Sequence, residues 1–207
     1  MAEYPREFPL LISPNIASFD FFDLASGTAY KKFYASATSA TNAGTKYFLT
    51  TQVNAGGTGA LTIESGSSEL NFDTSVFTTP LTVEGECMIH VPNSVINDTG
   101  SSQTQTAVIT VVVYHVDKAS TETSLGTDFY THTATSLGVG ATSYSDALFK
   151  ITLQKKQIAV GEKLRLSVTS NQTAGSGDHT LYFDALNTTT GSLVSSQLTM
   201  DIPFFVG

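Results

Sequence analysis

Histidines and carboxylates are the side chains of this sequence that could perform chemistry. The four histidines stand far apart, and none lies at a metal-ligand spacing or beside a cysteine: His90, His115, His132 and His179. A zinc site on strands would have to combine such distant residues. The tightest polar cluster joins Asp178, His179 and Asp184, after the glycine-rich stretch 174–177. A solvated loop before a strand accounts for that cluster, so we expect no metal and no cofactor.

Two glutamates could serve acid–base catalysis. Glu84 and Glu86 project from one face of a predicted strand, about 7 Å apart given the strand rise, and paired carboxylates are what glycoside hydrolysis requires. The chain has no tryptophan, however, so Tyr or Phe would have to supply the aromatic platform of a sugar cleft. It also lacks a Gly-x-Ser-x-Gly elbow, a phosphate-binding glycine loop and a dinucleotide fingerprint. The sequence therefore predicts a non-catalytic protein.

Calcium and thiol chemistry have weak candidates. Asn97 and Asp98 with Gly100, and Asp178 with Asp184, supply oxygen ligands of the kind that calcium prefers, but neither group has a defined calcium spacing. Cys87 is the single cysteine, so an intrachain disulfide is excluded. Because Cys87 lies on the apolar phase of a predicted strand, it is expected to be a buried structural thiol.

The charge balance excludes two classes of partner. The formal net charge is −8, the isoelectric point is near 4.8, and charged residues make up 14% of the chain. The few lysines and arginines are scattered, whereas nucleic-acid grooves and anionic membrane surfaces need clustered cations. We expect neither a nucleic acid nor a membrane as partner. Ser and Thr fill about a quarter of the chain, which suits a β protein with uncharged surface.

The first residues give an expectation about localisation. Residues 1–14 contain no cationic region followed by an apolar run, so the sequence predicts no secretory signal peptide and synthesis in a cytoplasm. The three Asn-x-Thr sequons, at Asn97, Asn171 and Asn187, are then expected to carry no glycan.

Alternating apolar and polar residues predict the fold. Period-two alternation marks strands at 81–91, 149–153, 163–168 and 198–204, and shorter runs bring the expected total to about ten strands. The segment 154–162 is expected to join its two flanking strands as a long hairpin. No helical period is sustained. The prediction is an all-β, antiparallel two-sheet β-sandwich of the jelly-roll type.

Two parts of the chain are expected to make contacts between subunits. Residues 1–16 form a predicted extended arm before a single sandwich domain at 17–207, because three prolines forbid a helix there. The strand 107–116 is apolar on both phases, so its outer face must be covered by a loop, by the arm or by another subunit. The interface residues we predict are Phe8, Leu10, Leu11 and Ile12 of the arm and Val108, Val112, Tyr114 and Val116 of the strand.

Several segments resemble virion proteins of tailed phages and related environmental viruses. The similarity begins at residues 19–30 and 33–35, and it extends through 47–49, 81–91, 149–153, 160–166 and 198–204. This resemblance implies a single jelly roll in a capsid-associated role. The stretch Gly-Glu-Lys-Leu-Arg-Leu at 161–166 also resembles carbohydrate-binding jelly rolls.

The resemblance and the residues together favour a virion structural protein. We expect a decoration, cement or minor shell protein, a homo-oligomer and most simply a trimer, which binds neighbouring capsid proteins and stabilises the virion. The alternative is a carbohydrate-binding module for host attachment, with Tyr130, Tyr144 and Tyr182 stacking on a glycan. A glycan hydrolase that uses strand carboxylates ranks third.

Overall fold

The protein is described here from a computed structural model, which defines residues 28–36, 47–51, 60–63, 67–183 and 197–205. These residues form strands and turns, and no helix. None of them therefore forms a helix long and apolar enough to cross a membrane. The strands are β1 (Thr28–Ser36), β2 (Tyr47–Thr50), β3 (Ala60–Ile63), β4 (Ser67–Thr74), β5 (Leu81–Ile96), β6 (Gln103–Val116), β7 (Glu122–Leu137), β8 (Thr142–Ile158), β9 (Lys163–Ala174), β10 (His179–Tyr182) and β11 (Thr199–Phe205).

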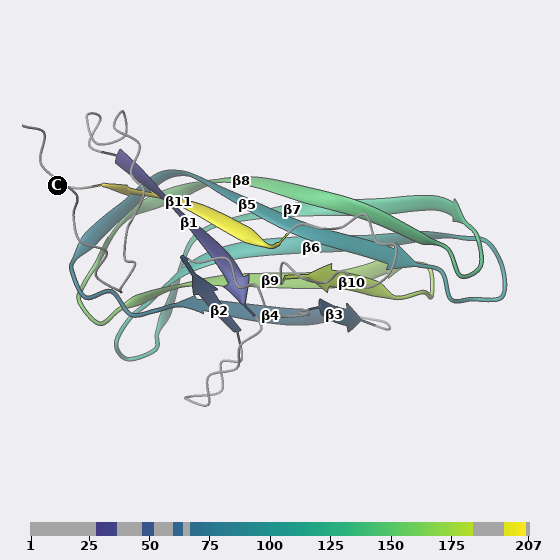
Figure 1. Cartoon of the computed structure of the whole chain (residues 1–207), viewed down its shortest axis with the longest axis horizontal. Helices are drawn as coiled ribbons and strands as arrows, with labels where there is room; N and C mark the ends of the chain where they lie inside the picture. Colours follow the sequence, from purple (N-terminus) through teal and green to yellow (C-terminus); the bar gives the residue numbers. More distant parts are fainter. Residues whose placement is uncertain (1–27, 37–46, 52–59, 64–66, 184–196, 206–207) are drawn as a thin grey trace, which may run out of the picture.

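Hydrogen bonds join all these strands into one sheet. The order is β3-β10-β5-β11-β1-β2-β4-β9-β6-β7, and β8 pairs with the other edge of β5 along the whole strand. The sheet curls so that β5, β8 and β11 face β9 and β4 across the core (Figure 1). One half of the sheet contains β3, β10, β5, β8, β11 and β1, and the other contains β2, β4, β9, β6 and β7. The halves are joined through β2, which pairs in parallel with β4 over three positions. The all-β prediction is confirmed as a curled, open sheet that is antiparallel apart from this one pair. The finer jelly-roll assignment stays a prediction.

One predicted connection is wrong. Strands β8 and β9 follow each other through the turn at 159–162, but they do not pair as the expected hairpin. Strand β8 pairs with β5 over most of its length, whereas β9 lies between β4 and β6. The chain therefore crosses from one half of the curled sheet to the other at this turn. Alternation predicted both strands but carried no information about their partners.

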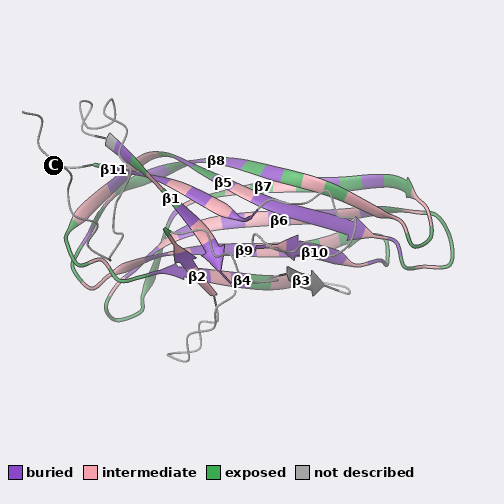
Figure 2. Cartoon of the chain, in the orientation of Figure 1, coloured by how far each residue is buried: buried purple, intermediate pink, exposed green. Residues whose placement is uncertain are grey.

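The core lies between the two halves of the sheet. Alternate residues of each long strand point into it, so buried and exposed residues follow each other along β8 (Figure 2). Phe72 of β4, Tyr47 of β2 and Phe183 form an aromatic group with ring centroids 5.0 to 5.5 Å apart. Cys87 is fully buried in the same core, and burial raises the pKa of its thiol to about 12. The prediction of an inert structural cysteine agrees with this position.

The curled sheet has two free long edges. In the described part of the chain, β7 pairs with β6 alone and β8 pairs with β5 alone. The two edges approach closely at Gly126 of β7, because a Cβ atom there would collide with the side chain of Ile151 and press on the carbonyl oxygen of Thr152. The missing side chain at this position lets β8 lie against β7 without hydrogen-bonding to it.

Candidate functional site

The outer face of β6 and β7 carries the most exposed large apolar side chain of the described residues. Phe129 of β7 is 68% exposed and lies directly opposite Thr110 of β6. Val108 and Val112 are its diagonal neighbours on β6, close enough for an aromatic ring to touch. We call this surface the β6–β7 face, and its members are Thr106, Val108, Thr110, Val112, Tyr114, Thr127, Phe129, Thr131 and Thr133.

The β6–β7 face has no charged member. Three of its neighbours on β9 are also uncharged, since Ser167, Thr169 and Asn171 pair with Val112, Thr110 and Val108. The neighbour of Tyr114 is Arg165. The protein as a whole carries a formal net charge of −8. A neutral face with an exposed phenylalanine is therefore an exception on this surface.

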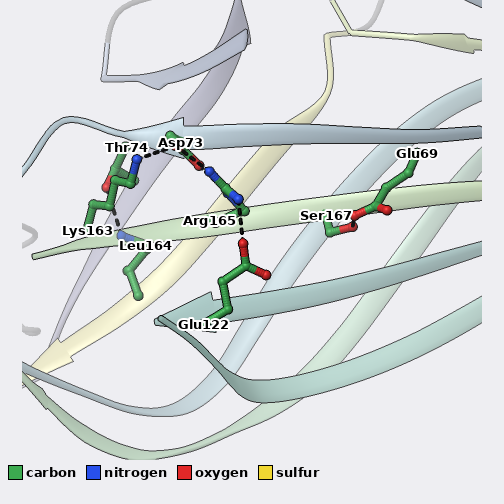
Figure 3. A network of polar contacts seen from close by, with 8 residues as sticks. All are labelled: Glu69, Asp73, Thr74, Glu122, Lys163, Leu164, Arg165 and Ser167. Carbon is green, nitrogen blue, oxygen red and sulfur yellow. Dashed lines mark hydrogen bonds and ion pairs between the residues drawn. The ribbon is translucent and has the colours of Figure 1, made fainter. Parts of the chain in front are cut away.

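Charged residues gather beyond one end of this face. Arg165 of β9 donates to both carboxylate oxygens of Asp73, from Nε at 2.5 Å and from Nη2 at 2.8 Å (Figure 3). Its Nη1 donates to Glu122 at 2.5 Å, and Lys163 donates to Asp73 at 2.5 Å. Burial acts to raise the pKa of Asp73, but Arg165 and Lys163 outweigh it, and the pKa is lowered. The two carboxylates and two cations of this network neutralise one another. Glu69, which accepts a hydrogen bond from Ser167 at 2.8 Å, places one further carboxylate beside the face.

The predicted interface residues divide into three groups. Val108, Val112 and Tyr114 lie half-buried on the outer side of β6, as expected. Val116, the last residue of β6, does not: it is 1% exposed. The arm residues Phe8, Leu10, Leu11 and Ile12 lie outside the described residues, as does the boundary between the predicted arm (1–16) and domain (17–207). Phe129 was not among the predicted interface residues. Its side chain points outward, because it alternates along β7 with Tyr130 and His132, which point inward.

The interior changes character along its length. Toward the end where β10 lies (Figure 1), residues of the inward phase become polar on β5, β6, β7, β9 and β10. We call this region the polar end, and its residues are Asn93, Gln105, His132, Ser170, Gln172 and His179. Period-two analysis could have found it, because each residue interrupts an apolar phase. The histidines were instead tested for metal spacing alone.

Asn93 organises one side of the polar end. Its Nδ2 donates to the carbonyl oxygens of Val91 and Ser145, at 3.3 and 3.0 Å. Its Oδ1 must therefore accept from His132 Nδ1, 2.7 Å away. This assigns the proton of neutral His132 to Nδ1, so that Nε2 accepts from the Ser143 hydroxyl at 3.2 Å. Burial lowers the pKa of His132.

His179 occupies the other side of the polar end and is 0% exposed. Its Nδ1 is hydrogen-bonded to the Ser170 hydroxyl. Burial, with a smaller contribution from His132, lowers the pKa of His179 to about 4. His179 Nε2, Gln105 Nε2 and Gln172 Oε1 have no hydrogen-bond partner among the described residues. Buried water with two or three such partners is the usual way to satisfy a group of this kind.

A third candidate lies on the opposite outer surface, over β5, β8, β11 and β1. A shallow depression of about 390 Å³ is lined by Lys32, Tyr34, Met88, His90, Leu148, Gln197, Thr199 and Asp201. His90 Nε2 lies 3.1 Å from a carboxylate oxygen of Asp146. Farther along β8, the rings of Tyr144 and Tyr182 lie 6.5 Å apart. Tyr130, expected beside them, is instead in the interior, with its ring against Phe149 and its hydroxyl on Ser145.

The acidic candidates are occupied by structural contacts. Glu84 and Glu86 form ion pairs with Lys155 and Lys150, at 3.4 and 2.7 Å. Within the described residues, no three His, Cys, Asp or Glu side chains come together as metal ligands. Asp184, one of the calcium candidates, lies outside those residues.

Asn97 belongs to a turn. It is buried, its amide donates to the carbonyl oxygens of Ser101 and Leu137, and its Oδ1 accepts from Thr99. These contacts use both ends of the side-chain amide, so Asn97 serves neither as a calcium ligand nor as a glycan acceptor in this fold.

Comparison with known proteins identifies the fold at a distance. No family model and no curated protein matches the sequence. Among solved structures, a CocE/NonD family hydrolase from Staphylococcus aureus matches with a TM-score of 0.55 and 11% identity over 86% of this chain. An aminopeptidase from a marine sediment Thaumarchaeota archaeon matches with a TM-score of 0.56 and 10% identity over 86% of this chain. This chain spans 37% of the length of each.

These comparisons contradict the prediction of a non-catalytic protein. Solved structures that share its fold with TM-scores above 0.5 include a hydrolase and an aminopeptidase. The likeness describes the fold alone at such identities. Infectious bursal disease virus and a carbohydrate-binding module with bound β-1,4-galactotriose match with a TM-score of 0.29, too low to support either the virion or the glycan prediction.

Proposed function

We propose that the protein is a structural component of a virus shell, a decoration, cement or minor shell protein that binds copies of itself through the β6–β7 face. The observation that carries the proposal is Phe129, 68% exposed at the middle of an uncharged face. Burying an exposed phenylalanine and its valine neighbours against another subunit removes apolar area from water. The resemblance of several segments to phage virion proteins supports the virion setting.

Charge favours a second copy as the occupant of this face. Two copies of a chain with a net charge of −8 repel each other. A contact between copies, including the heterologous contact of a trimer, is therefore most favourable where charge is absent. The β6–β7 face meets that requirement, and the bordering carboxylates of Asp73 and Glu122 are already paired with Arg165.

The mass of the full chain in solution tests the proposal. We expect an oligomer by light scattering, a trimer most simply, that shifts toward monomer in the Phe129→Ser variant. Leu148→Ser is the matched control, because Leu148 is 62% exposed on the opposite outer surface. A wild-type monomer, or an equal response of the two variants, would contradict the proposal. Deletion of residues 1–16 tests separately whether the predicted arm strengthens the contact.

The second candidate function is glycan binding over the depression and the neighbouring tyrosine pair. The surface combines apolar atoms of Met88 and Leu148 with polar groups of His90 and Thr199, and sugars need both kinds of contact. Chemical-shift titration with neutral oligosaccharides is the test, and Tyr144→Ala should abolish any response. Ester and aminoacyl-anilide substrates, added to the same sample, test the activity suggested by the hydrolases that share the fold.

A further inference from the structure

The two buried histidines of the polar end lie between strands from both halves of the curled sheet. His132 of β7 contacts Asn93 of β5 and Ser143 of β8. His179 of β10 contacts Ser170 of β9. Each imidazole therefore ties a strand of one half to a strand of the other. In these hydrogen bonds both imidazole rings are neutral.

We propose that the polar end is an acid-sensitive part of the fold, which opens locally when His132 and His179 take up protons while the apolar core stays closed. Protonated His132 would turn Nε2 from an acceptor into a donor and lose the hydrogen bond from Ser143, unless that hydroxyl reorients. Two imidazolium ions would also repel each other. Both effects favour an open arrangement in which water reaches the rings.

Among the described residues, the side chains hydrogen-bonded to the two rings are neutral. They are Asn93 of β5 and Ser143 of β8 at His132, and Ser170 of β9 at His179. Among titratable groups, Tyr130 lies nearby, with its hydroxyl on Ser145. Asp178 precedes His179, and its backbone carbonyl accepts from the Ile96 amide at 2.8 Å. Within the described residues, neither His132 nor His179 forms an ion pair with a carboxylate, whereas His115 and His90 do.

Little apolar packing holds the polar end. The buried apolar residues interspersed with its polar side chains are Val95, Ala107 and Ala134, with Leu137 packed against them. The larger apolar cluster lies in the centre of the interior and contains Ile109, Val111, Phe149 and Val168. An opening at the polar end can therefore leave that cluster intact, as local unfolding commonly does.

Hydrogen–deuterium exchange of the full chain at pH 7.5 and 5.0, corrected for intrinsic rates, tests the proposal. A shift of the His179 pKa from 6.5 to about 4 corresponds to about a 30-fold loss of protection at pH 5.0 for an opening that frees this ring. We expect a loss of this size in residues 93–97, 131–137, 142–145 and 170–180. Residues 109–113 and 149–153 exchange only when the apolar core opens, so their protection should stay well above that of the polar end at both pH values.

Variants separate the histidines from one another. The double variant His132→Gln and His179→Gln should show the same protection at both pH values, whereas His90→Gln, on the outer surface, should behave as wild type. Because the double variant could fail to fold, the imidazole signals of His132 and His179 in the wild type are also followed by NMR, and both should titrate below 6.5. Equal protection of the polar end and the core at pH 5.0, unchanged protection at the polar end, or ordinary titration of both histidines would overturn the proposal.

Discussion

The apolar centre of the interior and its polar end are built from the same strands, yet they are held together by different forces. On β5 the inward phase changes from Val91 to Asn93, and on β9 it changes from Val168 to Ser170. Packing at the centre is non-directional and depends on filled volume. At the polar end every buried group needs a partner in a defined position. The centre therefore supplies stability, and the polar end supplies a specific arrangement that depends on protonation.

The two regions also differ in the buried polar atoms that lack a hydrogen-bond partner. At the centre, the buried side chains have no polar atoms to satisfy. At the polar end, three polar atoms lack a partner within the described residues, on Gln105, Gln172 and His179. Each such atom costs free energy unless water reaches it. The polar end should accordingly be the weaker part of the interior.

The largest expected change in stability comes from a substitution in the apolar centre. Phe72→Ala removes a fully buried ring that contacts Tyr47 and Phe183. The loss of transfer free energy and the cavity left behind should lower the free energy of unfolding by about 4 kcal/mol. Urea denaturation measures this change. A loss below about 1 kcal/mol would mean that the aromatic group is not part of the cooperative core.

The next largest effect is a pH dependence of stability that arises from the polar end and not from the apolar centre. The pKa of His179 is about 4 in the folded chain, below its ordinary value of 6.5. The unfolded chain therefore binds a proton first, so stability is complete above pH 6.5 and falls as the pH drops toward 4. Protonation of His179 should lower the free energy of unfolding by about 3 kcal/mol in total. Asp73, whose pKa is lowered, contributes its own loss only near and below its ordinary value of 3.8.

Thermal or urea unfolding at several pH values between 7.5 and 4.5 checks this window. His179→Gln should flatten the dependence, and His90→Gln should leave it in place. A stability that is constant over the window would contradict the buried, neutral state of His179.

A smaller effect should follow from Asn93→Ala. The substitution removes two donated hydrogen bonds and leaves Nδ1 of His132 without its acceptor. We expect a loss of about 2 kcal/mol, typical of buried groups left unsatisfied. Asn171→Ala, at an exposed position on β9, is the control and should be close to neutral. The measurement is urea denaturation at pH 7.5.

The smallest effect on stability is expected at the β6–β7 face. Phe129→Ser exchanges an exposed side chain and should change the free energy of monomer unfolding by less than about 0.5 kcal/mol. The measurement is made at a concentration low enough for the monomer to predominate. A large loss would show that Phe129 packs within its own chain, which would weaken its role in self-association.

Sequence alternation predicted the strands well because period two is a local property of each strand. It failed for the partners of β8 and β9, since pairing depends on how distant strands meet. It also placed Tyr130 on a surface, whereas the ring points inward beside Phe149. The polar end was overlooked because its residues interrupt apolar phases one at a time in separate strands. Their proximity emerges only after the sheet curls.

Gly126 affects how the strand edges of one molecule can associate with those of another. Its missing side chain lets the unpaired edge of β8 shelter against the unpaired edge of β7. An alanine at this position would force the two edges apart and expose both rows of amide and carbonyl groups to other molecules. Such rows act as templates for edge-to-edge aggregation. A single hydrogen atom in place of a methyl group is thus expected to limit edge-to-edge association between copies of this chain.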